Sequence, residues 1–125
     1  MYEHFQVKDL WTGEELECRW KATIVAIATR HADAVDVRFD VNGRPLWIAL
    51  PATAWTEQKR RSGMAITDHL AAQIAGRYLQ QIVREGFDSN REVYTMTVAE
   101  VLAHLDAVVE EAKQNGALPS VPVIA

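Results

Sequence analysis

The strongest constraint on the fold is an alternation of apolar and charged residues that ends at Asn42-Gly43. From Asp33 to Val41, valine and phenylalanine alternate with charged side chains, which is the period of a half-buried strand. The Asn-Gly dipeptide tolerates a positive φ at both positions and favours a two-residue hairpin turn. The pattern therefore predicts an antiparallel hairpin whose return strand runs from Arg44 to Leu50.

The predicted hairpin has one self-consistent register. It pairs apolar residues across the two strands, namely Phe39 with Leu46, Val37 with Ile48 and Val35 with Leu50. Because every inward residue meets an apolar partner, a slip by one residue would expose the whole inner face.

Two further strands are predicted before this hairpin. The segment from Leu16 to Thr29 has one mostly apolar face, made of Leu16, Cys18, Trp20, Ala22, Ile24, Ala26 and Ala28. A turn at Arg30 to Asp33 would pair Ala28 with Val35, Ala26 with Val37 and Ile24 with Phe39. The segment from Tyr2 to Leu10 is expected to supply a first strand.

The second half of the chain has helical periodicity. A broad apolar stripe spans Ile66 to Glu85, with Thr67 or Asp68 as a cap and Gly86 suited to the position after its end. Gly76 inside this helix indicates a close approach of another element. Two further helices are expected, a long one that begins with the capping box Thr97 to Glu100, and a short one over Thr53 to Arg61, with Trp55 docking inward.

Together these elements predict an α+β fold. An N-terminal antiparallel β-meander of three to four strands is followed by two long α-helices and one short helix. We expect a single domain over residues 1–117 and an extended C-terminal tail over residues 118–125.

Composition excludes several classes of protein. The 125 residues are 49% hydrophobic and 24% charged, with a net charge of -4, which is typical of a globular chain and not of a disordered one. A single cysteine cannot form a disulfide framework, and no apolar run approaches the length needed to span a bilayer. The N-terminus lacks the features of a secretory signal, so we expect no membrane association and a cytoplasmic location.

The sequence gives no positive support for catalysis. Nucleophile elbows, phosphate-binding loops and dinucleotide fingerprints are absent, so no catalytic residue and no cofactor is predicted. Cys18 lies on the inward side of its strand and is expected to be a buried hydrophobe. The densest group of potential metal ligands, His31, Asp33 and Asp36, lacks a second histidine or cysteine, so no metal site is predicted.

Two polar features are candidate sites. His104 follows Glu100 by four residues, which predicts a solvated ion pair on the polar side of the last helix. The basic run from Lys59 to Arg61 could contact phosphates, but the acidic balance of the chain argues against a nucleic acid as a partner. The run is better explained as the basic last turn of a short helix.

The outer face of the predicted sheet is the most informative feature. The register places Arg38 opposite Trp47 and Val25, and Asp36 opposite Ala49 and Ile27. Such a contiguous apolar surface marks an interface unless a helix covers it within the same chain. A second candidate seam lies along the last helix, with Val98, Val101, Leu105, Val108 and Ala112.

These features predict a small non-catalytic interaction domain that self-associates as a homodimer, with any other protein partner unknown. The binding candidates are the outer-face residues Val25, Ile27, Arg38 and Trp47. The alternative is a small enzyme or small-ligand binder with a pocket between the sheet and the helices, for which the candidates are Trp20, Trp55, His69 and Tyr78.

Overall fold

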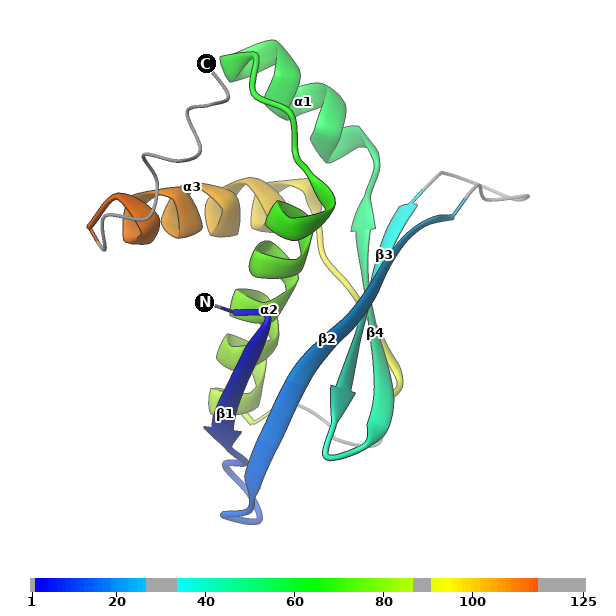
Figure 1. Cartoon of the computed structure of the whole chain (residues 1–125), viewed down its shortest axis with the longest axis vertical. Coiled ribbons are helices and arrows are strands. Elements are labelled where there is room, and N and C mark those ends of the chain that lie inside the picture. The colour runs from blue at the N-terminus through cyan, green and yellow to red at the C-terminus, as the bar shows by residue number, and fades with distance from the viewer. Residues whose placement is uncertain (1, 27–33, 87–90, 115–125) are drawn as a thin grey trace.

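The structure is a computed structural model that describes residues 2–26, 34–86 and 91–114 (Figure 1). In chain order the elements are β1 (His4–Lys8), β2 (Glu15–Ala26), β3 (Ala34–Val41), β4 (Arg44–Pro51), α1 (Thr53–Ser62), α2 (Asp68–Arg84), β5 (Val93–Thr95) and α3 (Val98–Gln114). The predicted α+β class, with a strand meander before the helices, is confirmed.

The strands form one sheet in the order β1-β2-β3-β4-β5. The first four strands pair antiparallel with their neighbours, whereas β5 returns after α2 and pairs parallel to β4. The sequence does not predict β5, because a strand of only three residues is too short for an alternation to be recognised.

The hairpin between β3 and β4 has the predicted register, with Phe39 opposite Leu46 and Val37 opposite Ile48. Asn42 and Gly43 both adopt a positive φ, of 51° and 85°. The Asn42 side chain accepts a hydrogen bond from the backbone N–H of Glu17 at 2.7 Å. The turn is therefore fixed to β2 as well as to its own strands.

The predicted register between β2 and β3 is wrong, since Ala26 lies opposite Ala34 instead of Val37. A β-bulge between Trp20 and Ala22 also changes the face on which the later residues of β2 lie. Before the bulge, Trp20 lies opposite Phe39 on the inner side. After it, Ile24 lies opposite Asp36 instead of Phe39. A bulge adds one residue to a strand, so the residues beyond it exchange faces. The predicted turn at residues 30–33 lies outside the described residues.

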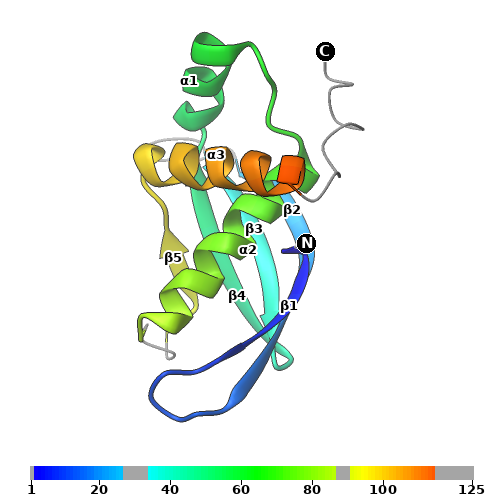
Figure 2. The ribbon, with the colours of Figure 1, turned by 90° about the vertical axis from the view of Figure 1, so that its left-hand side faces the viewer.

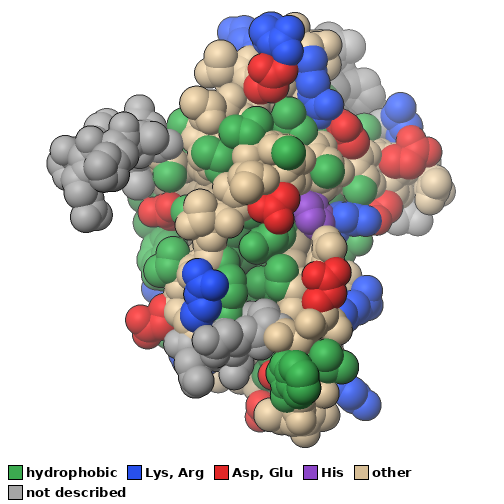
Figure 3. Space-filling model, turned by 180° about the vertical axis from the view of Figure 1, so that it is seen from behind, with side chains coloured by type: hydrophobic (Ala, Val, Ile, Leu, Met, Phe, Trp, Pro, Cys, Tyr) green, Lys and Arg blue, Asp and Glu red, His purple; other side chains and the backbone are tan. Residues whose placement is uncertain are grey.

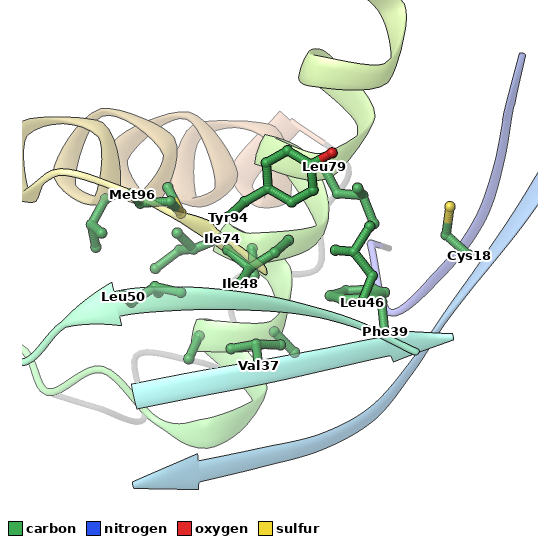
Figure 4. Close-up of a cluster of buried hydrophobic side chains, with 14 of the residues drawn as sticks. Cys18, Val37, Phe39, Leu46, Ile48, Leu50, Ile74, Leu79, Tyr94 and Met96 are labelled. Carbon is green, nitrogen blue, oxygen red and sulfur yellow. The ribbon is translucent and has the colours of Figure 1, made fainter. Parts of the chain in front are cut away.

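The core lies between the inner face of the sheet and the helices (Figure 4). Val37, Phe39, Leu46, Ile48 and Leu50 from β3 and β4 are buried together with Ile74 and Leu79 of α2, Tyr94 of β5, and Met96, which follows β5. Cys18 is fully buried, as predicted.

Helices α2 and α3 lie over the same face of the sheet, and α1 lies beyond one end of β4 (Figures 1 and 2). None of the described helices covers the opposite face (Figure 1). The predicted seam on α3 is not free, because Val101, Leu105 and Val108 are buried within the chain.

The predicted helix signals are confirmed. The Thr67 side chain accepts a hydrogen bond from Leu70 N–H, and Gly86 after α2 has a φ of 86°. At the start of α3, Thr97 and Glu100 form a reciprocal capping box, with N···O distances of 2.8 Å and 3.1 Å.

Gly76 lies where the N-terminal segment crosses α2. A Cβ atom added there would come within 2.8 Å of Tyr2 Cβ and 3.1 Å of Phe39 Cζ, and would also meet the Tyr2 carbonyl oxygen. The close approach that the sequence indicated is therefore present.

Among the described residues, no helix combines the length and the apolar character that crossing a membrane would require. The predicted tail over residues 118–125 lies outside the described residues.

Candidate functional site

The outer face of the sheet carries two adjacent rows of residues, one position from each of β2, β3, β4 and β5. The register defines an arginine row, which consists of Ala22, Arg38, Trp47 and Val93. It also defines an aspartate row, which consists of Ile24, Asp36, Ala49 and Thr95.

Both rows expose apolar side chains. Ile24 and Val93 are 48% and 51% exposed and are among the few large hydrophobic residues that the described structure leaves in solvent. Trp47, Ala22 and Ala49 are half-buried by their neighbours on the sheet. Apolar side chains grouped in this way on a sheet face are typical of an interaction surface.

The charges of this face are unevenly paired. Arg38 donates from Nε to Asp40 Oδ1 at 3.0 Å, and its Nη2 lies 3.0 Å from the same oxygen. Asp36 is half-buried and forms no hydrogen bond or ion pair within the described part of the chain. Burial raises the pKa of its carboxyl group above the ordinary value.

The outer-face predictions are partly confirmed. Arg38 lies opposite Trp47 and Asp36 opposite Ala49, as predicted. Val25 is wrongly placed, because after the bulge its Cα pairs with that of Val35, an inner-face position. Ile27 lies outside the described residues. Ile24 and Val93 were missed, because the first depends on the bulge and the second on β5.

A second feature is a hollow of about 340 Å³ between α2 and α3, lined by Arg77, Tyr78, Gln81, Ile82, Glu85, Glu100, Ala103 and His104. A neighbouring hollow of about 310 Å³ shares Arg77, Gln81 and Glu85 with it. Figure 3 shows acidic and basic side chains around a histidine on one side of the molecule.

The predicted solvated pair of His104 with Glu100 is wrong. His104 is buried, and its Nδ1 lies 2.9 Å from Arg77 Nη1. Glu100 is instead used in the capping box of α3. Periodicity placed both residues on one flank of α3, but it could not show that α2 packs against that flank.

Arg77 determines the state of the His104 imidazole. A guanidinium only donates hydrogen bonds, so Nδ1 must accept, and the ring is neutral with its proton on Nε2. Burial, followed by the charge of Arg77, lowers the pKa of His104. Arg77 Nε also donates to Glu111 at 3.1 Å, and Tyr2 Oη donates to the other oxygen of Glu111 at 2.7 Å.

The predicted pocket residues do not converge. Trp55 packs on the core and donates to Ile66 O at 3.1 Å, whereas His69 is exposed beside Trp20. Tyr78 lies at the α2–α3 hollow, in edge-to-face contact with His104 at 5.8 Å.

The remaining polar candidates are the basic run and the potential metal ligands. Two residues of the basic run are paired, Arg60 with Glu57 and Arg61 with Asp106. Of the potential metal ligands, His31 and Asp33 lie outside the described residues, and the described ones include no group of three or more that could hold a metal ion.

An exposed turn between β1 and β2 was not predicted as a candidate. Leu10 and Trp11 are 56% and 74% exposed, and Figure 3 shows hydrophobic side chains gathered at this lower end of the molecule. The buried Asp9 carboxylate fixes the turn by accepting from Trp11 N–H at 2.8 Å and Thr12 N–H at 3.1 Å.

Comparison of the chain with protein-family models, with curated proteins and with solved structures finds no match.

Proposed function

We propose that this chain is a small interaction domain that self-associates through the outer face of its sheet. The observation that carries the proposal is the pair of adjacent rows, which place Ile24, Trp47 and Val93 on a face that no described helix covers. Burying such side chains against a partner removes apolar surface from water, which is the main driving force of association.

A second copy of the chain is the partner that this face fits best. Symmetric homodimers are the commonest oligomers, and their interfaces must be self-complementary. The outer face meets this condition, because acidic and basic residues alternate along β3 at Asp36, Arg38 and Asp40.

Equilibrium sedimentation tests the proposal. At high micromolar concentration the wild type is expected to sediment at twice its 14.0 kDa mass. Ile24→Lys should sediment as the monomer, because it places a charge within the buried face. Leu10→Lys is the matched control, since Leu10 is similarly exposed but lies in the β1–β2 turn. A wild-type monomer, or dissociation by the Leu10 variant only, would contradict the proposal.

A small-ligand site in the α2–α3 hollow is a second candidate. Its volume of about 340 Å³ is within the range of ligand pockets, and Arg77, Tyr78 and the neutral His104 meet there. Titration with acetate and with methylamine, followed by backbone amide NMR, would test it. Chemical-shift changes of the amides of these three residues would support a ligand site. If neither probe changes them, the proposal of a ligand site is contradicted.

A further inference from the structure

The two outer-face rows are complementary to each other, strand by strand. On β2, Ala22 of the arginine row lies beside Ile24 of the aspartate row, and on β4 Trp47 lies beside Ala49. On β3 the two positions carry opposite charges, Arg38 and Asp36. Each of these three strands thus holds one larger and one smaller side chain, or one cation and one anion, at successive outward positions.

A two-fold axis can use this pattern. If the axis lies between the two faces, perpendicular to the strands and between the rows, each strand lies antiparallel over its own copy. The arginine row of one copy then covers the aspartate row of the other. Packed sheets cross at about 30°, so the alignment is best kept by β3 and β4 at the centre of the face.

The apolar contacts in this arrangement place large side chains over small ones. Trp47 of one copy lies over Ala49 of the other, and Ile24 lies over Ala22. Alternation of large and small residues across facing layers is what allows a close-packed interface without voids.

The charges are matched in the same arrangement. Arg38 of each copy lies over Asp36 of the other, which gives two identical ion pairs close to the axis. Asp36 has no partner among the described residues, and Arg38 bonds Asp40 only through Nε and Nη2. The Nη1 group, which makes no bond within the described part of the chain, supplies the donors that the half-buried carboxylate lacks.

Other placements of the axis fit less well. An axis along β3 would place Arg38 over Arg38 and Asp36 over Asp36, and like charges in contact oppose association. An axis between β3 and β4, parallel to the strands, would place Asp36 over Ala49 and leave the carboxylate buried without a partner.

The geometry points to a homodimer in which Asp36 and Arg38 pair reciprocally across a two-fold axis that sets β3 antiparallel over β3 of the second copy. This inference rests on the proposed function, since it specifies the partner and the register of the same face. It excludes head-to-tail chains, because the same patch serves both copies and the contact closes on itself.

Charge-reversal complementation tests the register. Asp36→Arg and Arg38→Asp are each expected to weaken self-association about 100-fold, roughly tenfold for each of the two symmetric contacts. In an equal mixture, Asp36→Arg carries cations at both positions 36 and 38, and Arg38→Asp carries anions at both, so opposite charges face each other in the heterodimer. The mixture should therefore form a heterodimer within about tenfold of the wild-type affinity. Glu110→Arg on α3 is the control reversal, and circular dichroism checks that each variant is folded.

The outcomes separate this inference from the proposed function. If the wild type dimerises and Ile24→Lys dissociates it, but the mixture associates no better than its components, the reciprocal pairing is overturned and the outer-face interface stands. The reciprocal pairing is also overturned if Asp36→Arg and Arg38→Asp each dimerise with the affinity of the wild type. If the wild type is a monomer, both proposals are overturned.

Discussion

His104 shows how one buried residue links the pH to the stability of the fold. Its imidazole accepts from Arg77 and is packed against Tyr78, and its pKa is lowered by burial. The folded state therefore binds the proton less well than the unfolded state, whose histidines titrate near pH 6.5. The stability that the neutral His104 contributes is therefore present above about pH 6.5 and is lost progressively as the pH falls below that value.

We expect His104→Gln to reduce this pH dependence, because a glutamine can accept from Arg77 but does not titrate. Urea unfolding at about pH 7.5 and 5.5 measures it, with His69→Gln as the exposed control. An equal loss of stability in the wild type and the His104 variant on acidification would contradict the account.

Cys18 is predicted to be inert in the folded protein. Burial, with a smaller contribution from Glu17, raises the pKa of its thiol to about 12. Because the thiolate is the reactive form, a disulfide reagent should label Cys18 only as fast as the protein opens. Labelling in native buffer at the rate of the urea-unfolded chain would show that the thiol is accessible.

The capping box of α3 gives a prediction at the scale of the element. Thr97→Ala removes the acceptor for Glu100 N–H and should lower the free energy of unfolding by about 1 kcal/mol. Thr53→Ala at the start of α1 is the matched control, because that helix has no side-chain cap. Similar losses for both variants in urea unfolding would argue against a specific contribution of the box.

The crossing of α2 by the N-terminal segment gives a second prediction at this scale. Gly76→Ala improves helix propensity but brings a methyl group against the Tyr2 backbone, so we expect a net loss of about 1–3 kcal/mol. Removal of residues 1 and 2 should abolish most of that loss, because the two closest atoms belong to Tyr2 and only the contact with Phe39 remains. A Gly76 variant as stable as the full-length wild type in urea unfolding would contradict the close approach.

Most elements could be predicted because their signals are local. The hairpin register followed from alternation and the Asn42-Gly43 turn, and the helix ends followed from Thr67, Gly86 and the α3 capping box. The bulge near Trp20 could not be predicted, since the residues after it, Ala22 to Ala26, are apolar on both faces of β2 apart from Thr23. This error placed Val25 on the outer face and left Ile24 out of it.

At the scale of the whole molecule, the sequence identified a surface but not its full composition. Arg38 and Trp47 were placed correctly because both belong to the hairpin. Val93 could not be assigned, because β5 reaches the sheet edge only after the chain has passed through α2. The burial of His104 could not be predicted either, because it depends on how α2 packs against α3, and the periodicity of one helix carries no information on that packing.

The account as a whole depends on the outer sheet face being buried between two copies of the chain. Isotope-filtered NMR on an equal mixture of labelled and unlabelled protein detects contacts between copies directly. The account predicts intermolecular NOEs from the Trp47 indole to the Ala49 methyl group and from the Ile24 side chain to Ala22. Intermolecular NOEs confined to the helices or to the Leu10-Trp11 turn, or none at high micromolar concentration, would contradict it.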